Sequence, residues 1–192
     1  VAVPDVVRGL ALAIEHMTRP DSAVVVPVPA YPPFLELPET VRRELVPVDA
    51  YGGIDLGDVE KAFAAGAGSI LLCSPNNPLG YTLSREYLVE LCDLAERYDA
   101  RVLVDEIHAP LVFDGQHVVA AGVSDAAARV CITVTATSKA WNIAGLKCAQ
   151  MFFTNPEDLD VWNRMTGVAK DGVSTLGIWA AIACYREGGD FL

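Results

Sequence analysis

The chain has 192 residues, 52% of them hydrophobic and 20% charged, so it can bury a substantial core in one large domain or in a domain with an appendage. Its formal net charge of −11 disfavours nucleic acids and anionic membranes as partners, because both attract basic surfaces. The five cysteines are scattered without a C-x-x-C pair, which argues against a zinc site or a disulfide framework.

Along the chain, short β-branched runs alternate with windows whose apolar residues recur at helical spacing. In chain order, the amino-terminal half predicts a helix over residues 6–17, strands over 23–27 and 41–49, a helix over 55–66 and a strand over 69–74. The other half predicts a helix over 84–98, strands over 101–105, 130–135 and 149–153, and a helix that opens at 155–162. Ser84 is suited to cap the third of these helices.

This alternation predicts an α/β protein, built as a three-layer αβα sandwich with a mainly parallel sheet that helices cover on both faces. In such sheets, ligands bind beyond the carboxyl ends of the strands. Polar and aromatic residues follow four of the predicted strands, in the segments "PVPAYPPF", "PNNPLG", "DEIHAP" and "ATSKAWN". We therefore expect the functional site where these four segments meet.

We find no signal-peptide pattern and no apolar stretch long enough to span a bilayer, and the cysteine usage suits reduced thiols, so a cytoplasmic location is expected. Two features indicate a piece of a larger protein. The chain begins at Val1, without methionine and just before a helical pattern, and it stops at "EGGDFL" just after another. Its mean hydropathy of +0.32 suits apolar surface that further chain or a partner covers.

Lys139 in "ATSKAWN" is the first candidate for chemistry. A lysine amine becomes a useful nucleophile toward an aldehyde when desolvation or neighbouring cations lower its pKa. Lys139 follows a buried strand and is flanked by Trp141 and Ile143, which can supply such surroundings. Taken alone, a Ser-Lys pair is also what an ordinary surface loop carries, so both interpretations stay open at this point.

Two further segments carry candidate polar groups. Asp105 follows an apolar run directly, so its carboxylate should lie at the carboxyl edge of the sheet and pair with a cationic or protonated group; a helix cap or a structural ion pair is the alternative. His108 can reach the same cleft or serve as a structural histidine. Asn77 precedes a tight turn at Pro78 and Gly80 that can present its amide inward.

The remaining candidates would bind flat or anionic groups. Tyr31 lies among prolines that stiffen its loop, and it suits either stacking on a ligand or packing. Ser138 and Lys147 bracket a segment that can hold an anion through a hydroxyl and an ammonium. The glycines of "AAGAGS" lack the third glycine of a dinucleotide fingerprint, and "SPNNPLG" is not a Walker loop.

The joint order of these residues resembles the fold-type I pyridoxal 5′-phosphate (PLP) enzymes of the class I/II aminotransferase superfamily. The resemblance covers the chain from about Val3 to about Met165. Within that superfamily, four segments look most like the cystathionine β-lyase group typified by MalY and PatB: "PAYPPF", "SPNNPLG", "VDEIHAPLVF" and "SKAWNIAGLK".

The resemblance implies a role for each residue that would contact the cofactor ring. Lys139 matches the lysine that forms a Schiff base with PLP and later moves the Cα proton. Asp105 matches the aspartate that keeps the pyridinium nitrogen protonated, so that the ring acts as an electron sink. Asn77 matches the asparagine that binds the 3′-oxygen, and Tyr31 matches the aromatic residue stacked on the ring.

The resemblance also implies how the phosphate is held. Ser138 matches a phosphate ligand, and Lys147 stands where many aminotransferases have an arginine. The start of the first helix, around Pro4–Val6, would add a helix amino terminus to this anion site. His108 replaces the tyrosine with which aminotransferases usually contact the 3′-oxygen, a departure that the lyase group shares.

By this resemblance, residues 1–192 form the PLP-binding large domain of a longer protein. Family members also carry an amino-terminal segment and a carboxy-terminal small domain, which supplies an arginine for the substrate carboxylate. A tyrosine from the neighbouring subunit usually completes the site, so the full-length protein is expected to be a homodimer acting on an amino acid. The large domain alone need not turn over substrate.

The expected function is that of a PLP-dependent C–S β-lyase, which releases ammonia, pyruvate and a thiol from cystathionine-like substrates. His108 and the residues of the segment "SKAWNIAGLK" favour this activity. One alternative is an aminotransferase that passes an amino group to a keto acid, because the first chemical steps are shared. A second alternative is a non-catalytic PLP-binding regulatory domain.

Overall fold

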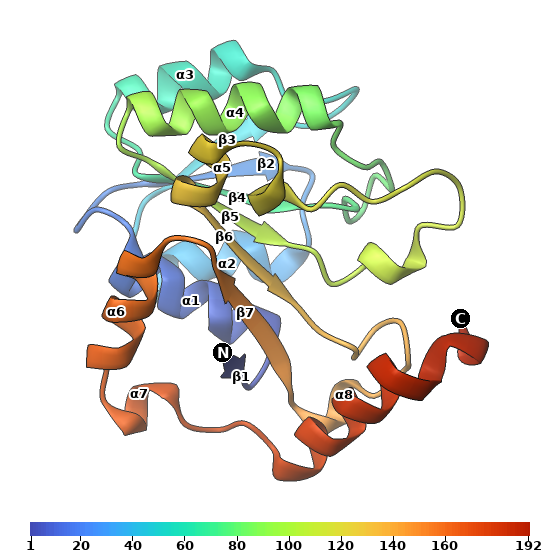
Figure 1. Ribbon diagram of the computed structural model, residues 1–192. Helices are drawn as coiled ribbons and strands as arrows, with labels where there is room; N and C mark the ends of the chain where they lie inside the picture. Colours follow the sequence, from blue (N-terminus) through green and yellow to red (C-terminus); the bar gives the residue numbers. More distant parts are fainter.

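The computed structural model describes residues 1–192 and contains one seven-stranded sheet in the order β1-β7-β6-β5-β4-β2-β3 (Figure 1). Strands β2 to β6 pair in parallel, whereas β7 is antiparallel to β6 and β1 is antiparallel to β7. The predicted mainly parallel sheet is therefore confirmed. The strands are β1 (Ala2–Val3), β2 (Val24–Val28), β3 (Leu45–Asp49), β4 (Ser69–Cys73), β5 (Arg101–Asp105), β6 (Cys131–Thr135) and β7 (Ala149–Phe153).

Helices cover both faces of this sheet, as the sandwich prediction requires. Helices α3, α4 and α5 pack over one face, and α1, α2 and α6 over the other (Figure 1). The helices are α1 (Val6–Met17), α2 (Pro32–Thr40), α3 (Leu56–Ala64), α4 (Arg85–Arg97), α5 (Asp125–Val130), α6 (Pro156–Arg164), α7 (Gly167–Lys170) and α8 (Thr175–Glu187). None of them is long and apolar enough to cross a membrane.

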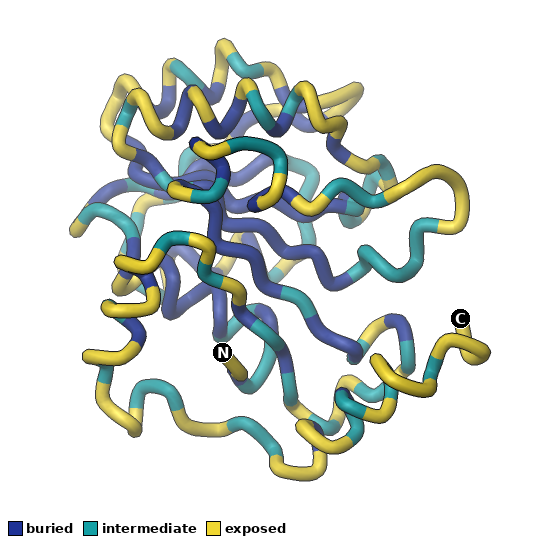
Figure 2. Tube along the Cα trace, viewed as in Figure 1, coloured by how far each residue is buried: buried dark blue, intermediate teal, exposed yellow.

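The central strands are buried from both sides, which explains their composition. All five residues of β4 are buried, and four of the five in β2, β5 and β6 are buried too. A strand covered on both faces has no polar face, so it forms from a continuous apolar run and not from an alternating one. Figure 2 shows this buried layer in dark blue between the more exposed helices.

The segment between β2 and β3 differs from the prediction. Pro32 and Pro33 begin helix α2 and do not merely stiffen a loop, because the first helical positions need no backbone N–H. The strand predicted over 41–49 starts only at Leu45. Its first residues end α2 instead: the Val41 N–H binds the Leu37 carbonyl at 3.1 Å, and Arg42 turns the chain with φ 57°.

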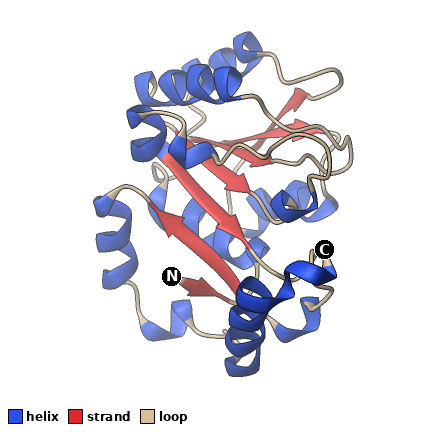
Figure 3. Cartoon of the chain, turned by 45° about the vertical axis from the view of Figure 1, so that its right-hand side comes forward, coloured by secondary structure: helices blue, strands red, loops and turns tan.

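Two other helices, α5 and α7, and strand β1 were not predicted. Helices α5 and α7 have six and four residues, too few for a periodic pattern, and β1 has two. Helix α8 lies where a helical pattern was expected just before "EGGDFL", although it carries apolar residues around its circumference and shows no single apolar face. Figure 3 shows that α8 lies beside the carboxyl ends of the strands, outside the three layers.

The sheet places the ends of β4, β5 and β6 side by side. Cys73 pairs with Asp105, and Asp105 pairs with Val134, so the residues that follow these strands emerge at one edge. At the opposite end of β5, Arg101 forms a two-pronged ion pair with buried Asp158 of α6, at 2.8 and 2.5 Å. The position of β5 is thus held at both of its ends.

Candidate active site

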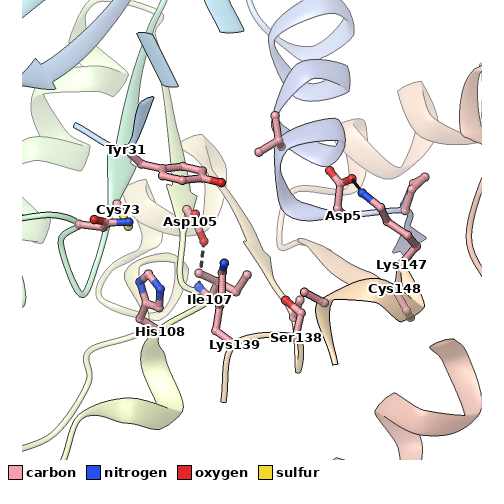
Figure 4. A pocket seen from close by; sticks show the side chains of 15 residues that line it. Asp5, Tyr31, Cys73, Asp105, Ile107, His108, Ser138, Lys139, Lys147 and Cys148 are labelled. Carbon is pink, nitrogen blue, oxygen red and sulfur yellow. Dashed lines mark hydrogen bonds and ion pairs between the residues drawn. The ribbon is translucent and has the colours of Figure 1, made fainter. Parts of the chain in front are cut away.

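A cavity of about 240 Å³ opens at the carboxyl edge of the sheet and is lined by 15 residues (Figure 4). The structure brings every predicted site residue into this one cavity, although they come from four separate segments. These residues are Tyr31, Asn77, Asp105, His108, Ser138, Lys139 and Lys147. Their roles in binding and catalysis remain predictions.

Asp105 is the buried acid of the cavity. Its Oδ1 accepts a hydrogen bond from the Ile107 N–H at 2.9 Å. Burial raises the pKa of Asp105 to about 7, and the neighbouring Glu106 carboxylate adds to the rise, whereas the Ile107 N–H and the Lys139 ammonium oppose it. A carboxyl group in this state can stabilise a protonated ring nitrogen, and a cation placed beside it would in turn favour the carboxylate.

Lys139 extends into the cavity from the turn after β6, and Figure 4 shows its side chain between those of His108 and Ser138. The lysine is exposed, so the described residues do not supply the desolvation expected from its flanking apolar neighbours. Of these neighbours, Trp141 donates its Nε1–H to the Gly188 carbonyl at 2.8 Å. A ligand or further chain would have to bury the amine.

Asn77 and His108 come from adjacent loops. The Asn77 loop is closed by a Gly80 N–H bond to the Asn76 carbonyl at 2.9 Å, and Gly80 takes φ 78°, which glycine adopts without strain. Burial lowers the pKa of His108, the Lys139 charge lowers it further, and a hydrogen bond to the Pro75 carbonyl acts in the opposite direction. His108 is therefore a neutral imidazole at pH 7, which can accept or donate one hydrogen bond.

Tyr31 provides an aromatic surface in the cavity. It is the residue that precedes the first turn of α2, and its ring packs edge-on against Phe34, with centroids 5.8 Å apart. Phe34 is buried in the core below, so Tyr31 is held in place from one side. Its other side borders the cavity, and Figure 4 shows the ring extending across it.

The cationic end of the cavity contains an ion pair that the sequence did not reveal. Lys147 Nζ lies 2.9 Å from Asp5 Oδ2, while Asp5 Oδ1 caps α1 by accepting the Arg8 N–H at 2.8 Å. Burial raises the pKa of Asp5, but the Arg8 N–H and Lys147 outweigh it, so the net pKa lies below its usual value. An anion bound here would have to share Lys147 with Asp5.

Three titratable side chains of the cavity were missed by sequence reasoning: those of Asp5, Cys73 and Cys148. Burial, together with the nearby Asp105 carboxylate, raises the pKa of the Cys73 thiol to about 12, so the thiol stays protonated and donates to the Pro75 carbonyl at 3.1 Å. Its position at the end of β4 was the available signal, as was the place of Asp5 just before a predicted helix.

The side chains fit the cofactor that the resemblance implies. A buried carboxyl group, an aromatic ring, an amide and a primary amine border the cavity, and a lysine and the start of α1 form its cationic end. These are the groups needed to hold a pyridine ring, an aldehyde and a phosphate. The α/β sandwich, with this cavity at the carboxyl edge of its sheet, is that of the PLP-dependent transferase fold.

The chain belongs to the aminotransferase class I and II family, whose model matches residues 5–187. It is 61% identical over 191 residues to the cystathionine β-lyase of Corynebacterium glutamicum, covering 100% of this chain and 52% of that protein. It is 33% identical to the cystathionine β-lyase PatB of Bacillus subtilis, covering 98% of this chain and 51% of PatB. The chain spans about half the length of the curated relatives that it matches.

Solved structures show the same fold. A Corynebacterium diphtheriae protein assigned as a PLP-dependent β-cystathionase is 66% identical, with a TM-score of 0.98 over 100% of this chain and 51% of its own. Cystalysin from Treponema denticola, which contains PLP, is 28% identical, with a TM-score of 0.91 over 100% of this chain and 50% of its own.

Proposed function

We propose that this chain is the PLP-binding large domain, residues 1–192, of a C–S β-lyase that acts on cystathionine or a similar amino acid. The observation that carries the proposal is the meeting of Lys139, Asp105 and the Lys147 cation in one cavity, in a chain 61% identical to a cystathionine β-lyase. The substrate and the complete reaction belong to the whole protein, of which this chain covers about half.

The cavity residues would divide the cofactor among them. PLP, when bound, supplies an electron-withdrawing ring that stabilises negative charge at the substrate Cα. Asp105 would hold the ring nitrogen, Asn77 and neutral His108 the 3′-oxygen, and Tyr31 the ring face. The phosphate would lie at the other end of the cavity, against Ser138, Lys147 and the start of α1.

The residues of this chain have defined tasks in the reaction. Lys139 would attach the cofactor through Nζ, release it to the substrate amine, and then take the Cα proton as a general base. Loss of the β-thiolate breaks the Cβ–S bond, and the thiolate gains a proton. The net reaction is cystathionine plus water giving homocysteine, pyruvate and ammonia.

The cofactor assignment can be tested by covalent labelling. The full-length protein is incubated with PLP, reduced with borohydride, and mapped by mass spectrometry. We expect one pyridoxyl group, on Lys139. A Lys61→Arg variant, changed at an exposed lysine of α3, is the matched control and should label normally. Labelling scattered over surface lysines, with Lys139 unmodified, would contradict the assignment.

The reaction type is tested with the full-length protein and L-cystathionine, without any keto acid. We expect pyruvate and a free thiol in equal amounts. The family model also covers aminotransferases, so keto-acid-dependent amino transfer without pyruvate would favour that alternative. Labelling of Lys139 with neither activity would favour a regulatory PLP-binding domain.

We further propose that the full-length protein is a cytoplasmic homodimer. The five free cysteines suit a reducing compartment. Helix α8 and the turn after it expose large apolar side chains that a second subunit can cover, among them Leu176, Trp179, Tyr185 and Phe191. Sedimentation of the full-length protein should give twice the mass of one chain, and a monomer at micromolar concentration would contradict the proposal.

A further inference from the structure

Helix α8 contacts the segment that carries Lys139, although it lies outside the three layers of the sandwich (Figure 3). The indole Nε1–H of Trp141 donates to the carbonyl of Gly188, just after α8, at 2.8 Å. The same indole packs edge-on against Tyr185 of α8, with ring centroids 5.6 Å apart. Trp141 is therefore held by the last turn of this helix.

The end of α8 leaves room for the Trp141 indole to approach the backbone closely. A Cβ on Gly188 would collide with the indole Nε1, so only glycine lets the ring approach this closely. Tyr185 is held in turn, because its hydroxyl hydrogen-bonds the Oε1 of Gln150 in β7 at 2.9 Å. The indole thus rests against a part of α8 that is itself attached to the sheet.

The other end of α8 contacts the other end of the same segment. The Ser174 N–H, at the start of α8, donates to the Lys147 carbonyl at 3.0 Å. Gly177 lies so close to the Leu146 carbonyl that a Cβ there would overlap it. Helix α8 therefore supports the segment Ser138–Lys147 at both of its ends, and this segment holds three of the seven candidate site residues.

Backbone hydrogen bonds close the turn that carries Lys139. The Trp141 N–H binds the Thr137 carbonyl at 3.0 Å, and the Ile143 N–H binds the Ser138 carbonyl at 3.1 Å. Both bonds enclose Lys139. Because Trp141 follows Lys139 by two residues in this tight turn, the place where the indole is held sets where the lysine side chain leaves the backbone.

We propose that Trp141 is a positioning residue, through which α8 sets the direction of Lys139 toward the cofactor and Asp105. This inference rests on the proposed function, because it concerns the reaction of Lys139 with PLP. It predicts that disturbing the indole's contacts with α8 changes how fast Lys139 reacts, even when the fold is unaltered.

The test compares Trp141→Phe with Tyr51→Phe in the full-length protein. The first variant keeps an aromatic ring but removes the N–H that binds Gly188. The second changes an aromatic residue after β3 that is 70% exposed and lies outside both the cavity and α8, and it serves as the control. Cofactor-free protein is mixed with PLP, and borohydride added at intervals gives the rate at which Lys139 becomes labelled. Thermal unfolding midpoints are recorded alongside.

We expect Trp141→Phe to slow the labelling of Lys139 by about two- to tenfold, the range that one lost hydrogen bond of ordinary strength gives. Its unfolding midpoint should match that of Tyr51→Phe. A Gly188→Ala variant should slow labelling too, by displacing the indole, and less so when combined with Trp141→Phe, whose smaller ring leaves more room.

Labelling rates equal to that of the control, in both Trp141→Phe and Gly188→Ala, would overturn the inference. So would slower labelling that follows a lower unfolding midpoint in proportion, because that would show a structural role only. If the unmodified protein never labels Lys139, the proposed function falls together with this inference. If the unmodified protein labels Lys139 normally and the variants label it at the same rate, this inference falls but the proposed function stands.

Discussion

The two sides of the cavity are built in different ways. On the sheet side, Asp105 and Cys73 end neighbouring parallel strands, both are buried, and Asp105 takes its hydrogen bond from Ile107, two residues along the chain. On the loop side, Lys139 and Lys147 are exposed. The contacts that hold their segment come from far away: Asp5 lies 142 residues from Lys147, and Gly188 lies 47 residues from Trp141.

The sheet side and the loop side of the cavity are therefore suited to different roles. The buried strand ends create a low-dielectric environment that alters the protonation of an acid. The exposed segment places a mobile amine and a cation where a ligand can reach them, and its geometry depends on helices at both ends of the chain. Changes on the sheet side should therefore alter protonation and pH dependence, whereas changes on the loop side should alter attachment and affinity.

The largest effect is expected from removing the loop-side amine. Lys139→Ala should reduce pyruvate formation by the full-length protein by about a thousandfold or more, because the same group attaches the cofactor and moves the Cα proton. The unfolding midpoint should stay unchanged, since the side chain is exposed. Initial rates and a thermal melt check both statements.

Lys139→Arg is the matched control for charge, because arginine keeps the cation but neither attaches PLP nor releases a proton near pH 7. Both variants should lose activity equally. If Lys139→Arg kept most of the activity, the lysine would act through its charge alone, and the division between the two sides of the cavity would be wrong.

The next largest effect concerns the sheet-side acid. Asp105→Asn should lower the catalytic rate by about a hundredfold or more, because a neutral amide does not stabilise charge on the ring nitrogen. Lys139 should still become labelled with PLP, since its attachment belongs to the loop side. Loss of labelling in Asp105→Asn would show that the two sides cannot be separated.

Asp105 also predicts a pH dependence of stability in the cofactor-free protein. Its pKa is about 7 in the folded chain and 3.8 ordinarily, so between these values the folded state holds a proton that the unfolded state has lost. This group therefore makes the fold less stable as the pH rises from about 4 to about 7. Urea unfolding at pH 5 and pH 8 should show a smaller difference for Asp105→Asn than for the unmodified protein; an equal difference would contradict the assignment.

A smaller effect is expected at the cationic end. Lys147→Ala should weaken PLP binding by about five- to tenfold, somewhat less than a fully buried hydrogen bond to a charged group gives, because the lysine is partly solvated. Lys61→Ala, at an exposed lysine of α3, is the control. Equal dissociation constants for the two variants, measured by absorbance titration, would remove Lys147 from the site.

The sheet side could be predicted from sequence because its causes are local. A continuous apolar run predicts a doubly covered strand, and the residue after it must lie at the carboxyl edge, so Asp105 was placed correctly without knowledge of its neighbours. The prolines after β2 misled the prediction because they are compatible with both a loop and the first turn of a helix, and α2 begins there.

The loop side could be predicted only in part. Its residues were recognised from their order, but their supports are contacts between distant segments, which no local pattern records. Asp5 was missed as a partner of Lys147, and the contacts of α8 with the segment that carries Lys139 were missed as well. Trp141, two residues after Lys139, binds Gly188, which lies 47 residues further along the chain.

The smallest predicted effect concerns Asp5, which binds the cation that a phosphate would need. Asp5→Asn should strengthen PLP binding by about two- to fivefold, the size of a partly exposed ion pair, because Lys147 is then free for the phosphate and a negative charge is removed. Asparagine caps a helix as well as aspartate does, so α1 should keep its Arg8 hydrogen bond and the unfolding midpoint should not change.

Absorbance titration of the full-length cofactor-free protein measures this change, and Asp21→Asn, at a surface aspartate away from the cavity, is its control. Combining Asp5→Asn with Lys147→Ala should abolish the gain, because the benefit acts through the lysine. Weaker binding by Asp5→Asn would mean instead that Asp5 directs Lys147 toward the phosphate. The ion pair would then be a support of the loop side, like Trp141, and not a competitor for its cation.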